Sequence, residues 1–303
     1  MYDHENPDDF GSDQLNKYER RFARPRSRFW DSERARPSRL TPVAIDRSVA
    51  KKIPVRIQED RNTCVSFALT DAMQLLLWRE RRKKIELSAG YAHWLFNRSE
   101  QKPWCKDDAF SLAKGTLLLH RYPVCTTDYC SNTLPDCLPQ DSNSLNPSSE
   151  ARKAAQYGIA DFFFIDRRYV EKSDRLTPSL DGPDITNTNY LECILSQGHD
   201  IVLALDWPLT EIGKGPWSLR RNKLDGFPMW VPNACSTGHA LVVVGYNRIG
   251  KKPVYGADKE PYFVCRNTAA ASDKNGITYL TYDFVRAYAL YGVVVLKVRY
   301  FLK

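Results

Sequence analysis

The sequence predicts an α+β fold, in which a helical first half packs against a strand-rich, antiparallel β second half. Two observations carry this prediction. From Cys64 to about Lys84, apolar residues recur at three- and four-residue steps, the period of a helix that buries one face. Beyond residue 200, short runs of β-branched residues lie between turn residues, as strands do. Helices and strands that occupy separate halves of a chain are typical of α+β folds.

Three helices are expected in the first half. The longest covers about residues 64–84, where Val65, Leu69, Met73 and Leu76 share one face. Five basic residues lie between positions 79 and 84, and cations suit the negative end of a helix dipole. Further helices are expected at residues 88–98 and near 109–121. The helical part should therefore run from about residue 58 to about residue 130.

Four strands are expected in the second half, at residues 201–205, 240–245, 262–265 and 292–298. The strand-rich part should extend over about residues 185–303. Residues 131–150 are rich in Ser, Asn, Pro and Asp, so they are expected to form a loop.

Residues 1–39 are expected to form a flexible, charged N-terminal arm. Residues 1–16 carry five acidic and no basic side chains, whereas residues 17–39 carry nine basic and three acidic ones. A solvated arm is the plainest interpretation, and the alternatives are contacts with nucleic acid, an acidic lipid surface or an acidic protein. The arginines come with no zinc-finger spacing and no RNA-binding aromatic motif, so nucleic acid is expected only through this arm.

The cellular location is expected to follow from the absence of targeting signals. No run of about 18 apolar residues occurs, so no membrane span is expected. The polar start, Met1-Tyr-Asp-His-Glu-Asn6, lacks the basic and apolar regions of a secretory signal peptide. We therefore expect a cytoplasmic protein, or one exported without a cleaved signal that acts in the cytosol of a target cell.

The eight cysteines are expected to be free thiols, because the chain is long and no secretion signal is evident. Four of them, Cys105, Cys125, Cys130 and Cys137, lie close together in the sequence. Their spacing does not match the paired Cys-x-x-Cys pattern of zinc knuckles. No metal site and no organic cofactor are expected.

Cys64 is the candidate nucleophile because it stands at the predicted start of the longest helix. The N–H groups of a first helical turn and the helix dipole stabilise a thiolate, so a lowered pKa is expected for this cysteine. A thiolate is the reactive form in nucleophilic catalysis. Buried cysteines are common at such positions, however, and the neighbouring residues decide between the two interpretations.

The residues around Cys64 resemble those of the papain family of cysteine peptidases, in its bacterial branch. Gln58 lies six positions before Cys64, and the chain continues as Cys64-Val-Ser-Phe-Ala68 into the helix. In the family, a glutamine at that spacing completes the oxyanion hole. The resemblance therefore implies that the amide of Gln58 and the N–H of Cys64 stabilise the oxyanion, where one donor is worth about 3–4 kcal/mol.

The second half carries two more blocks that resemble the family. Gly238-His239-Ala240 leads into a hydrophobic strand that ends in Gly-Tyr, as the segment around the family's catalytic histidine does. Asn267-Thr268 follows a strand where the family has Asn-Ser. The resemblance implies that His239 is the base, that Asn267 orients it, and that Gly238 contacts substrate. It also implies a papain-like fold with the active-site cleft between the two halves.

One departure from the family lies directly after Asn267. The family continues Asn-Ser-Trp-Gly, and its tryptophan shields the Asn–His hydrogen bond from water, whereas this chain reads Asn267-Thr-Ala-Ala270. Either another aromatic residue takes over this role, or the pair is more exposed. Leu40-Thr-Pro-Val-Ala-Ile-Asp-Arg47 resembles the start of mature papain-like domains, so the domain is expected to span residues 40–303.

The function implied is that of a cysteine endopeptidase acting on a protein or peptide substrate. A delivered bacterial protease toxin, an effector restrained in its producer by a separate inhibitor or immunity protein, is the biological setting we expect. One alternative is a transamidase, deamidase or amidase on the same fold, which shares Cys–His chemistry. Another is a catalytically decayed, papain-like binding module. A third is a nucleic-acid-binding protein that works through residues 17–39.

Overall fold

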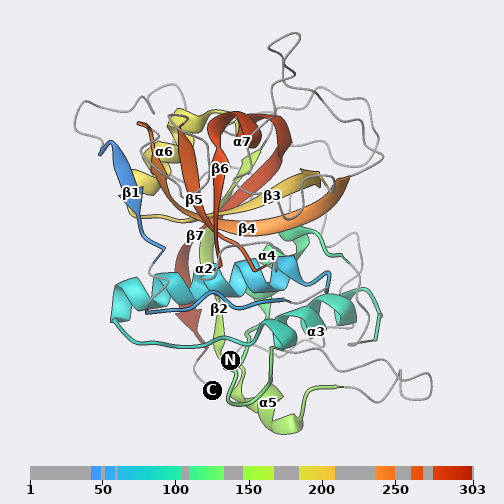
Figure 1. The fold of residues 1–303 in the computed structure, drawn as a ribbon. Helices are drawn as coiled ribbons and strands as arrows, with labels where there is room; N and C mark the ends of the chain where they lie inside the picture. Colours follow the sequence, from blue (N-terminus) through green and yellow to red (C-terminus); the bar gives the residue numbers. More distant parts are fainter. Residues whose placement is uncertain are drawn as a thin grey trace.

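The structure is a computed structural model, and it describes residues 42–48, 52–58, 61–103, 109–132, 146–166, 184–208, 236–249, 261–268 and 276–301. The arm expected at residues 1–39 and the cysteines Cys105, Cys137 and Cys235 lie outside these described residues. The α+β class predicted from the sequence is confirmed, with helices and an antiparallel sheet in separate layers (Figure 1).

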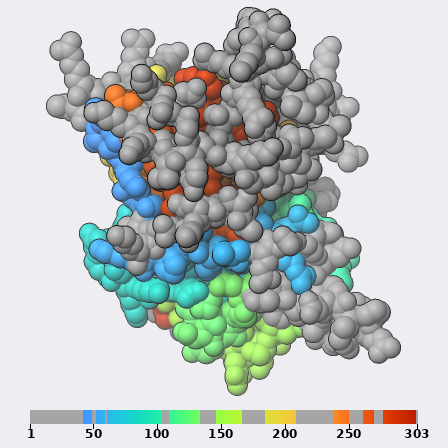
Figure 2. All heavy atoms as spheres, viewed as in Figure 1, coloured from blue at the N-terminus to red at the C-terminus, as the bar shows by residue number. Residues whose placement is uncertain are grey.

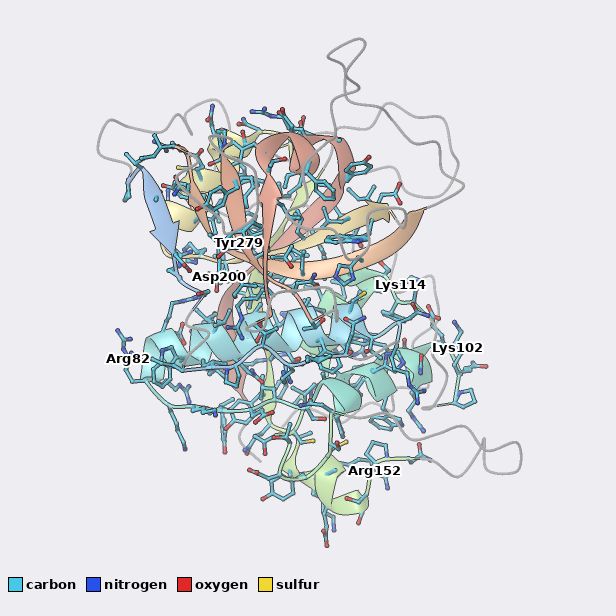
Figure 3. All side chains as sticks on the ribbon, in the orientation of Figure 1. Arg82, Lys102, Lys114, Arg152, Asp200 and Tyr279 are labelled. Carbon is cyan, nitrogen blue, oxygen red and sulfur yellow. The ribbon has the colours of Figure 1, made fainter. Side chains whose placement is uncertain are left out.

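The three helices predicted for the first half are α2 (Cys64–Arg81), α3 (Ala89–Ser99) and α4 (Leu112–Arg121). Helix α2 ends before the expected residue 84 because Arg82 adopts a left-handed conformation, with φ at 53°. The N–H of Arg82 donates to the carbonyl of Trp78, which closes the last turn. Figure 3 shows Arg82 at this end of α2. A short helix, α5 (Ser149–Ala154), begins within residues 131–150, where a loop is expected, and residues 133–145 of that range lie outside the described residues.

The four predicted strands are present as β3 (Ile201–Pro208), β4 (Ser236–Asn247), β5 (Tyr262–Arg266) and β7 (Ala289–Tyr300). With β1 (Ala44–Asp46), β2 (Tyr157–Asp166) and β6 (Ile277–Thr281) they form a seven-stranded sheet. Its strand order is β2-β7-β3-β4-β5-β6, and β1 pairs with β4. Every pairing is antiparallel.

Strand β2 and helix α6 (Thr188–Ser196) are not predicted from the sequence pattern. In β2, Ile159 and Phe162 face one core while Phe163 and Ile165 face the other, so both faces are buried and no clean polar alternation arises. Helix α6 and helix α7 (Tyr282–Tyr288) cover the sheet face opposite to α2.

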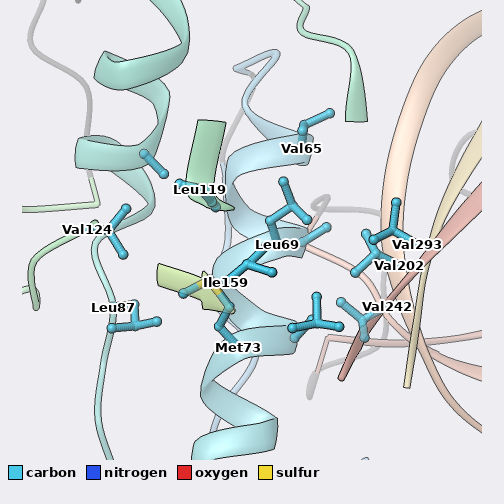
Figure 4. Close-up of a cluster of buried hydrophobic side chains, with 14 of the residues drawn as sticks. Val65, Leu69, Met73, Leu87, Leu119, Val124, Ile159, Val202, Val242 and Val293 are labelled. Atoms are coloured by element: carbon cyan, nitrogen blue, oxygen red, sulfur yellow. The ribbon is translucent and has the colours of Figure 1, made fainter. Parts of the chain in front are cut away.

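Helix α2 lies between the sheet and the other helices, and it positions the candidate site. Figure 4 shows Val65, Leu69 and Met73 of α2 with Val202, Val242 and Val293 of the sheet on one side. Leu119, Val124, Leu87 and Ile159 lie on the other side of the helix. In the space-filling view the cyan and green surfaces of the first half form the lower part of the molecule, and the blue atoms near the N-terminus extend up its left side (Figure 2). No helix in the described part of the chain is both long and apolar enough for a bilayer crossing.

Candidate active site

Cys64 is the first residue of α2, so it lies at a helix N-terminus as the sequence predicts. Thr63 precedes it as the N-cap residue, its side chain makes no capping bond, and the first turn contains no acidic residue. The N–H groups of this turn have no acceptors within the helix and favour negative charge close by. Cys64 itself is buried, with 7 % of its surface exposed.

His239 lies near the start of β4, where it is partly buried and pairs across the strands with Leu205. The next residue, Ala240, makes a backbone hydrogen bond to the thiol of Cys64. The packing of α2 against β4 therefore brings the sulfur next to the strand position that carries the histidine. The thiol of Cys64 thus contacts the backbone of the residue that follows His239, although the two come from opposite halves of the sequence.

Asn267 follows directly after β5 and holds the imidazole of His239. The Nε2 atom of His239 lies 2.8 Å from the Oδ1 atom of Asn267. Because an amide oxygen only accepts hydrogen bonds, Nε2 carries the hydrogen and Nδ1 is the acceptor of the neutral ring. Asn267 is itself fixed, since its N–H donates to Gly276 and its Nδ2 donates to Thr278. The free ring nitrogen of a neutral His239 is thereby available as a base.

Gln58 is tied to the residue that follows Asn267. The main-chain N–H of Gln58 donates to the carbonyl of Thr268 at 2.9 Å, and the Thr268 hydroxyl donates to Oε1 of Gln58 at 2.6 Å. The Nε2 atom of Gln58 donates one hydrogen to the carbonyl of Arg61. An amide NH2 group carries two hydrogens, so the second can serve an incoming oxygen. The orientation of the amide is set by Thr268.

Burial changes the charge state expected for the isolated groups. A lowered pKa is expected for Cys64 from its place at a helix N-terminus. In the structure burial raises the pKa of this thiol, and this effect is larger than the opposing effect of the backbone hydrogen bonds from Ala240, Val65 and Cys64. That prediction is wrong for the thiol taken alone. Burial also lowers the pKa of His239, and the hydrogen bond to Asn267 opposes this shift. Each charge is disfavoured alone, whereas a thiolate and an imidazolium formed together compensate each other.

Two further residues lie at His239. Gly238 is exposed, and a Cβ atom built there meets no atom of the described residues within 4 Å. The indole of Trp207 packs edge-to-face against the imidazole of His239, with 5.1 Å between the ring centroids. The sequence pattern does not reveal the contact of Trp207 with His239, because it depends on the register between β3 and β4. A tryptophan placed two residues beyond a predicted buried run was the signal available.

The remaining described histidines and cysteines lie elsewhere. His93 is buried in α3 beside Asn97, and His120 contacts the carbonyl of Ile159. Cys125 and Cys130 are free and buried, and the hydrogen bond to Cys130 and burial raise the pKa of Cys125. Within the described ranges, no group of three His, Cys, Asp or Glu side chains could hold a metal ion.

Comparison with known proteins identifies the class of structures whose fold this chain shares. No family model matches the sequence, and no curated protein matches it. Among solved structures, the chain is similar to xylellain, a cysteine protease from Xylella fastidiosa, with a TM-score of 0.60 and 17 % identity. This match covers 84 % of the present chain and 86 % of xylellain.

Two other solved structures extend the comparison. The cysteine protease and lectin-like domains of Cwp84, a surface layer associated protein of Clostridium difficile, match with a TM-score of 0.61 and 12 % identity. The match covers 88 % of this chain but only 53 % of that structure. Digestive procathepsin L 3 of Tenebrio molitor matches with a TM-score of 0.52 and 12 % identity over 95 % of this chain and 79 % of that one. The chain therefore has the papain-like fold of these cysteine proteases, as the sequence blocks around Cys64, His239 and Asn267 predicted.

Proposed function

We propose that this protein is a cysteine endopeptidase that hydrolyses peptide bonds in protein or peptide substrates. Cys64 is the nucleophile, His239 is the general base and acid, and Asn267 orients the imidazole. The observation that carries this proposal is the hydrogen bond between His239 and Asn267, on a strand whose next residue, Ala240, contacts the thiol of Cys64 at the N-terminus of α2. The papain-like fold supports it, since its solved neighbours are cysteine proteases.

The reaction begins with transfer of a proton from Cys64 to His239. Asn267 accepts a hydrogen bond from Nε2, so Nδ1 takes the proton and the ring becomes an imidazolium. The thiolate is stabilised by this cation, by the backbone of Ala240 and by the first turn of α2. It then attacks the carbonyl carbon of the scissile bond.

The attack places negative charge on the carbonyl oxygen. The N–H of Cys64 and the second amide hydrogen of Gln58 are the proposed donors to this oxyanion. Thr268 holds the amide of Gln58 with its oxygen turned towards the hydroxyl, which directs the nitrogen away from Thr268. Gly238, which is exposed, is the proposed contact for the substrate backbone.

The tetrahedral intermediate collapses when His239 gives its proton to the leaving amine. This leaves an acyl group on the sulfur of Cys64. His239, neutral again, removes a proton from a water molecule that attacks the thioester, and the released thiol restores the enzyme. The chain uses its own side chains in each of these steps.

The same chemistry would serve an enzyme that passes the acyl group to an amine or removes an amide nitrogen. Hydrolysis is favoured here because the Asn267-Thr268 pair and the position of Gln58 six residues before Cys64 match the peptidase pattern, and the Thr268 hydroxyl holds the amide of Gln58. Product mass spectrometry separates the reactions, since hydrolysis adds the mass of one water to the cleaved peptide. A decayed binding module would bind a partner and release no product.

The biological setting we propose is a bacterial protease toxin that acts on a protein in a target cell and is restrained by a separate inhibitor. It is supported by the resemblance of the residues around Cys64 to the bacterial branch of the family and by two solved neighbours that come from bacteria. Induced expression in a bacterial cytosol tests it. Growth should stop with the wild-type chain and continue with Cys64→Ala, whereas equal growth contradicts a toxic proteolytic role in that cytosol.

The proposed activity is tested by incubating the purified chain with denatured protein substrates and mapping the new termini by mass spectrometry. Wild type should release peptides, and Cys64→Ala should release none while its circular dichroism spectrum is unchanged, because the exchange removes only a sulfur atom. Cleavage retained by Cys64→Ala overturns the assignment of the nucleophile.

A further inference from the structure

We propose that Trp207 is a positioning residue for His239. Its indole holds the imidazole in the orientation that makes the hydrogen bond to Asn267, and it keeps water away from that hydrogen bond. The rings of Trp207 and His239 have centroids 5.1 Å apart and planes inclined by 70°. The catalytic consequence rests on the proposed function, whereas the positioning itself does not.

The antiparallel pairing of β3 and β4 brings the two rings together. Leu205 of β3 lies directly opposite His239 of β4. Residues two apart on a strand share a face, so Trp207 stands diagonally across from His239 on the same side of the sheet. Large aromatic side chains bridge such diagonal pairs. A slip of one residue in this register would turn Trp207 to the other face.

The indole of Trp207 is itself held in place. It is 5 % exposed and belongs to the core that lies between the sheet and helices α6 and α7. Phe284 of α7 packs edge-to-face against the indole of Trp207, with ring centroids 5.8 Å apart. Because the indole of Trp207 is held by the core around it, its edge-to-face contact limits rotation of the imidazole of His239.

The hydrogen bond to be protected is the one that sets the tautomer of His239. Asn267 is 1 % exposed, so access of water to this bond is governed by what covers the partly buried histidine. Water competes with Asn267 for the Nε2 hydrogen wherever it can reach it, and a buried, apolar cover strengthens the bond. Ala269, two residues beyond Asn267, has no side chain large enough to provide this cover. Trp207, from a different strand, supplies an indole at the histidine.

A plain core role would predict only a loss of stability when Trp207 is truncated. Trp94 of α3 is the matched control, because it is equally buried at 5 % exposure but belongs to the core around α2. The variants to compare are W207A, W207F and W94A, with H239Q to assign the histidine resonances.

The first readout is the imidazole N–H proton of His239, observed by NMR in protein labelled with ¹⁵N-histidine. In wild type and W94A this proton should exchange slowly enough with water to give a signal. In W207A the signal should disappear or broaden through fast exchange, and W207F should retain it, since a phenyl ring still covers part of the imidazole. A signal that persists in W207A, or that W94A loses equally, overturns the proposal.

The second readout is peptide hydrolysis. W207A should lose roughly 10- to 100-fold in kcat/KM, with the loss in kcat rather than KM, because a misplaced base slows chemistry without altering substrate contacts. W207F should recover most of the rate, and W94A should keep it. If wild type shows no hydrolysis, the proposed function fails, and the N–H signal still decides the role of Trp207. If W207A does not fold, W207L takes its place in both readouts with the same expected results.

Discussion

Two hydrogen bonds join Arg266 of β5 to Asp71 of α2, from Nε to Oδ2 at 2.6 Å and from Nη2 to Oδ1 at 2.9 Å. Both side chains are fully buried. The guanidinium also donates to the carbonyls of Ser48, Ile53 and Pro54. Since α2 begins at Cys64 and β5 leads into Asn267, this ion pair fixes the element that carries the nucleophile against the element that carries its orienting group.

Removing one partner of this pair should be strongly destabilising. Asp71→Ala leaves a buried, uncompensated guanidinium, and we expect a loss of about 3–5 kcal/mol in the free energy of unfolding, measured by urea denaturation. The matched control is Asp283→Ala, which breaks an ion pair with Arg286 whose side chains are about half exposed. That change should cost less than about 1 kcal/mol. Equal losses in the two variants would show that the buried pair has no special role.

The Thr268 hydroxyl should matter for rate because it orients Gln58. Thr268→Val keeps the shape of the side chain and removes the hydrogen bond to Oε1 of Gln58. We expect kcat to fall about 3- to 10-fold with KM unchanged, the range that corresponds to one hydrogen bond. Thr268→Ser keeps the hydroxyl and should restore the rate. A rise in KM alone would instead indicate a role in substrate binding.

Substitution of Asn267 should lower kcat more than substitution of Thr278, which holds the amide of Asn267. Asn267→Ala removes the acceptor for the Nε2 hydrogen of His239, and we expect kcat to fall by about 100-fold, as for a misplaced catalytic group. Thr278→Val removes only the contact to Nδ2 of Asn267 and should cost far less. Steady-state kinetics on both variants tests this order, which a purely structural Asn267 would not produce.

The stability of the fold should decrease in acid partly because two partly buried histidines, His239 and His199, have lowered pKa values in the folded state. Burial lowers the pKa of His239, and burial followed by the nearby Arg79 lowers the pKa of His199, against the opposing effect of Asp200. An unfolded histidine titrates near pH 6.5, so the unfolded state binds more protons below that pH. The stabilisation is therefore complete above about pH 6.5 and is lost as pH falls through the lowered pKa values of the folded state.

Urea denaturation between about pH 7.5 and pH 5 measures this loss. His239→Gln and His199→Gln should each lose less stability over this range than wild type, because each variant lacks one group that must be protonated. Parallel curves for wild type and both variants would show that other groups account for the acid sensitivity.

The sequence predicts the parts of this molecule that depend on local pattern. The helix that starts at Cys64 follows from its three- and four-residue period, and the strand after His239 follows from its β-branched run. The family resemblance implied Gln58 as an oxyanion donor beside Cys64 and Asn267 as the residue that orients His239. The role of Trp207 requires the register between two strands, and strand β2 lacks polar alternation because both of its faces are buried. The raised pKa of Cys64 reflects burial by distant segments, which a local pattern does not contain.

The measurement that tests the central claim most directly is labelling of the thiols with an epoxide probe between about pH 4 and pH 9, in wild type and in His239→Ala. Burial raises the pKa of Cys64, so a thiolate at neutral pH requires transfer of the proton to His239. The labelling rate therefore reports this proton transfer. We predict fast labelling of Cys64 alone in wild type at neutral pH, and slow labelling in His239→Ala. Slow labelling spread over the eight cysteines of both proteins would contradict the account.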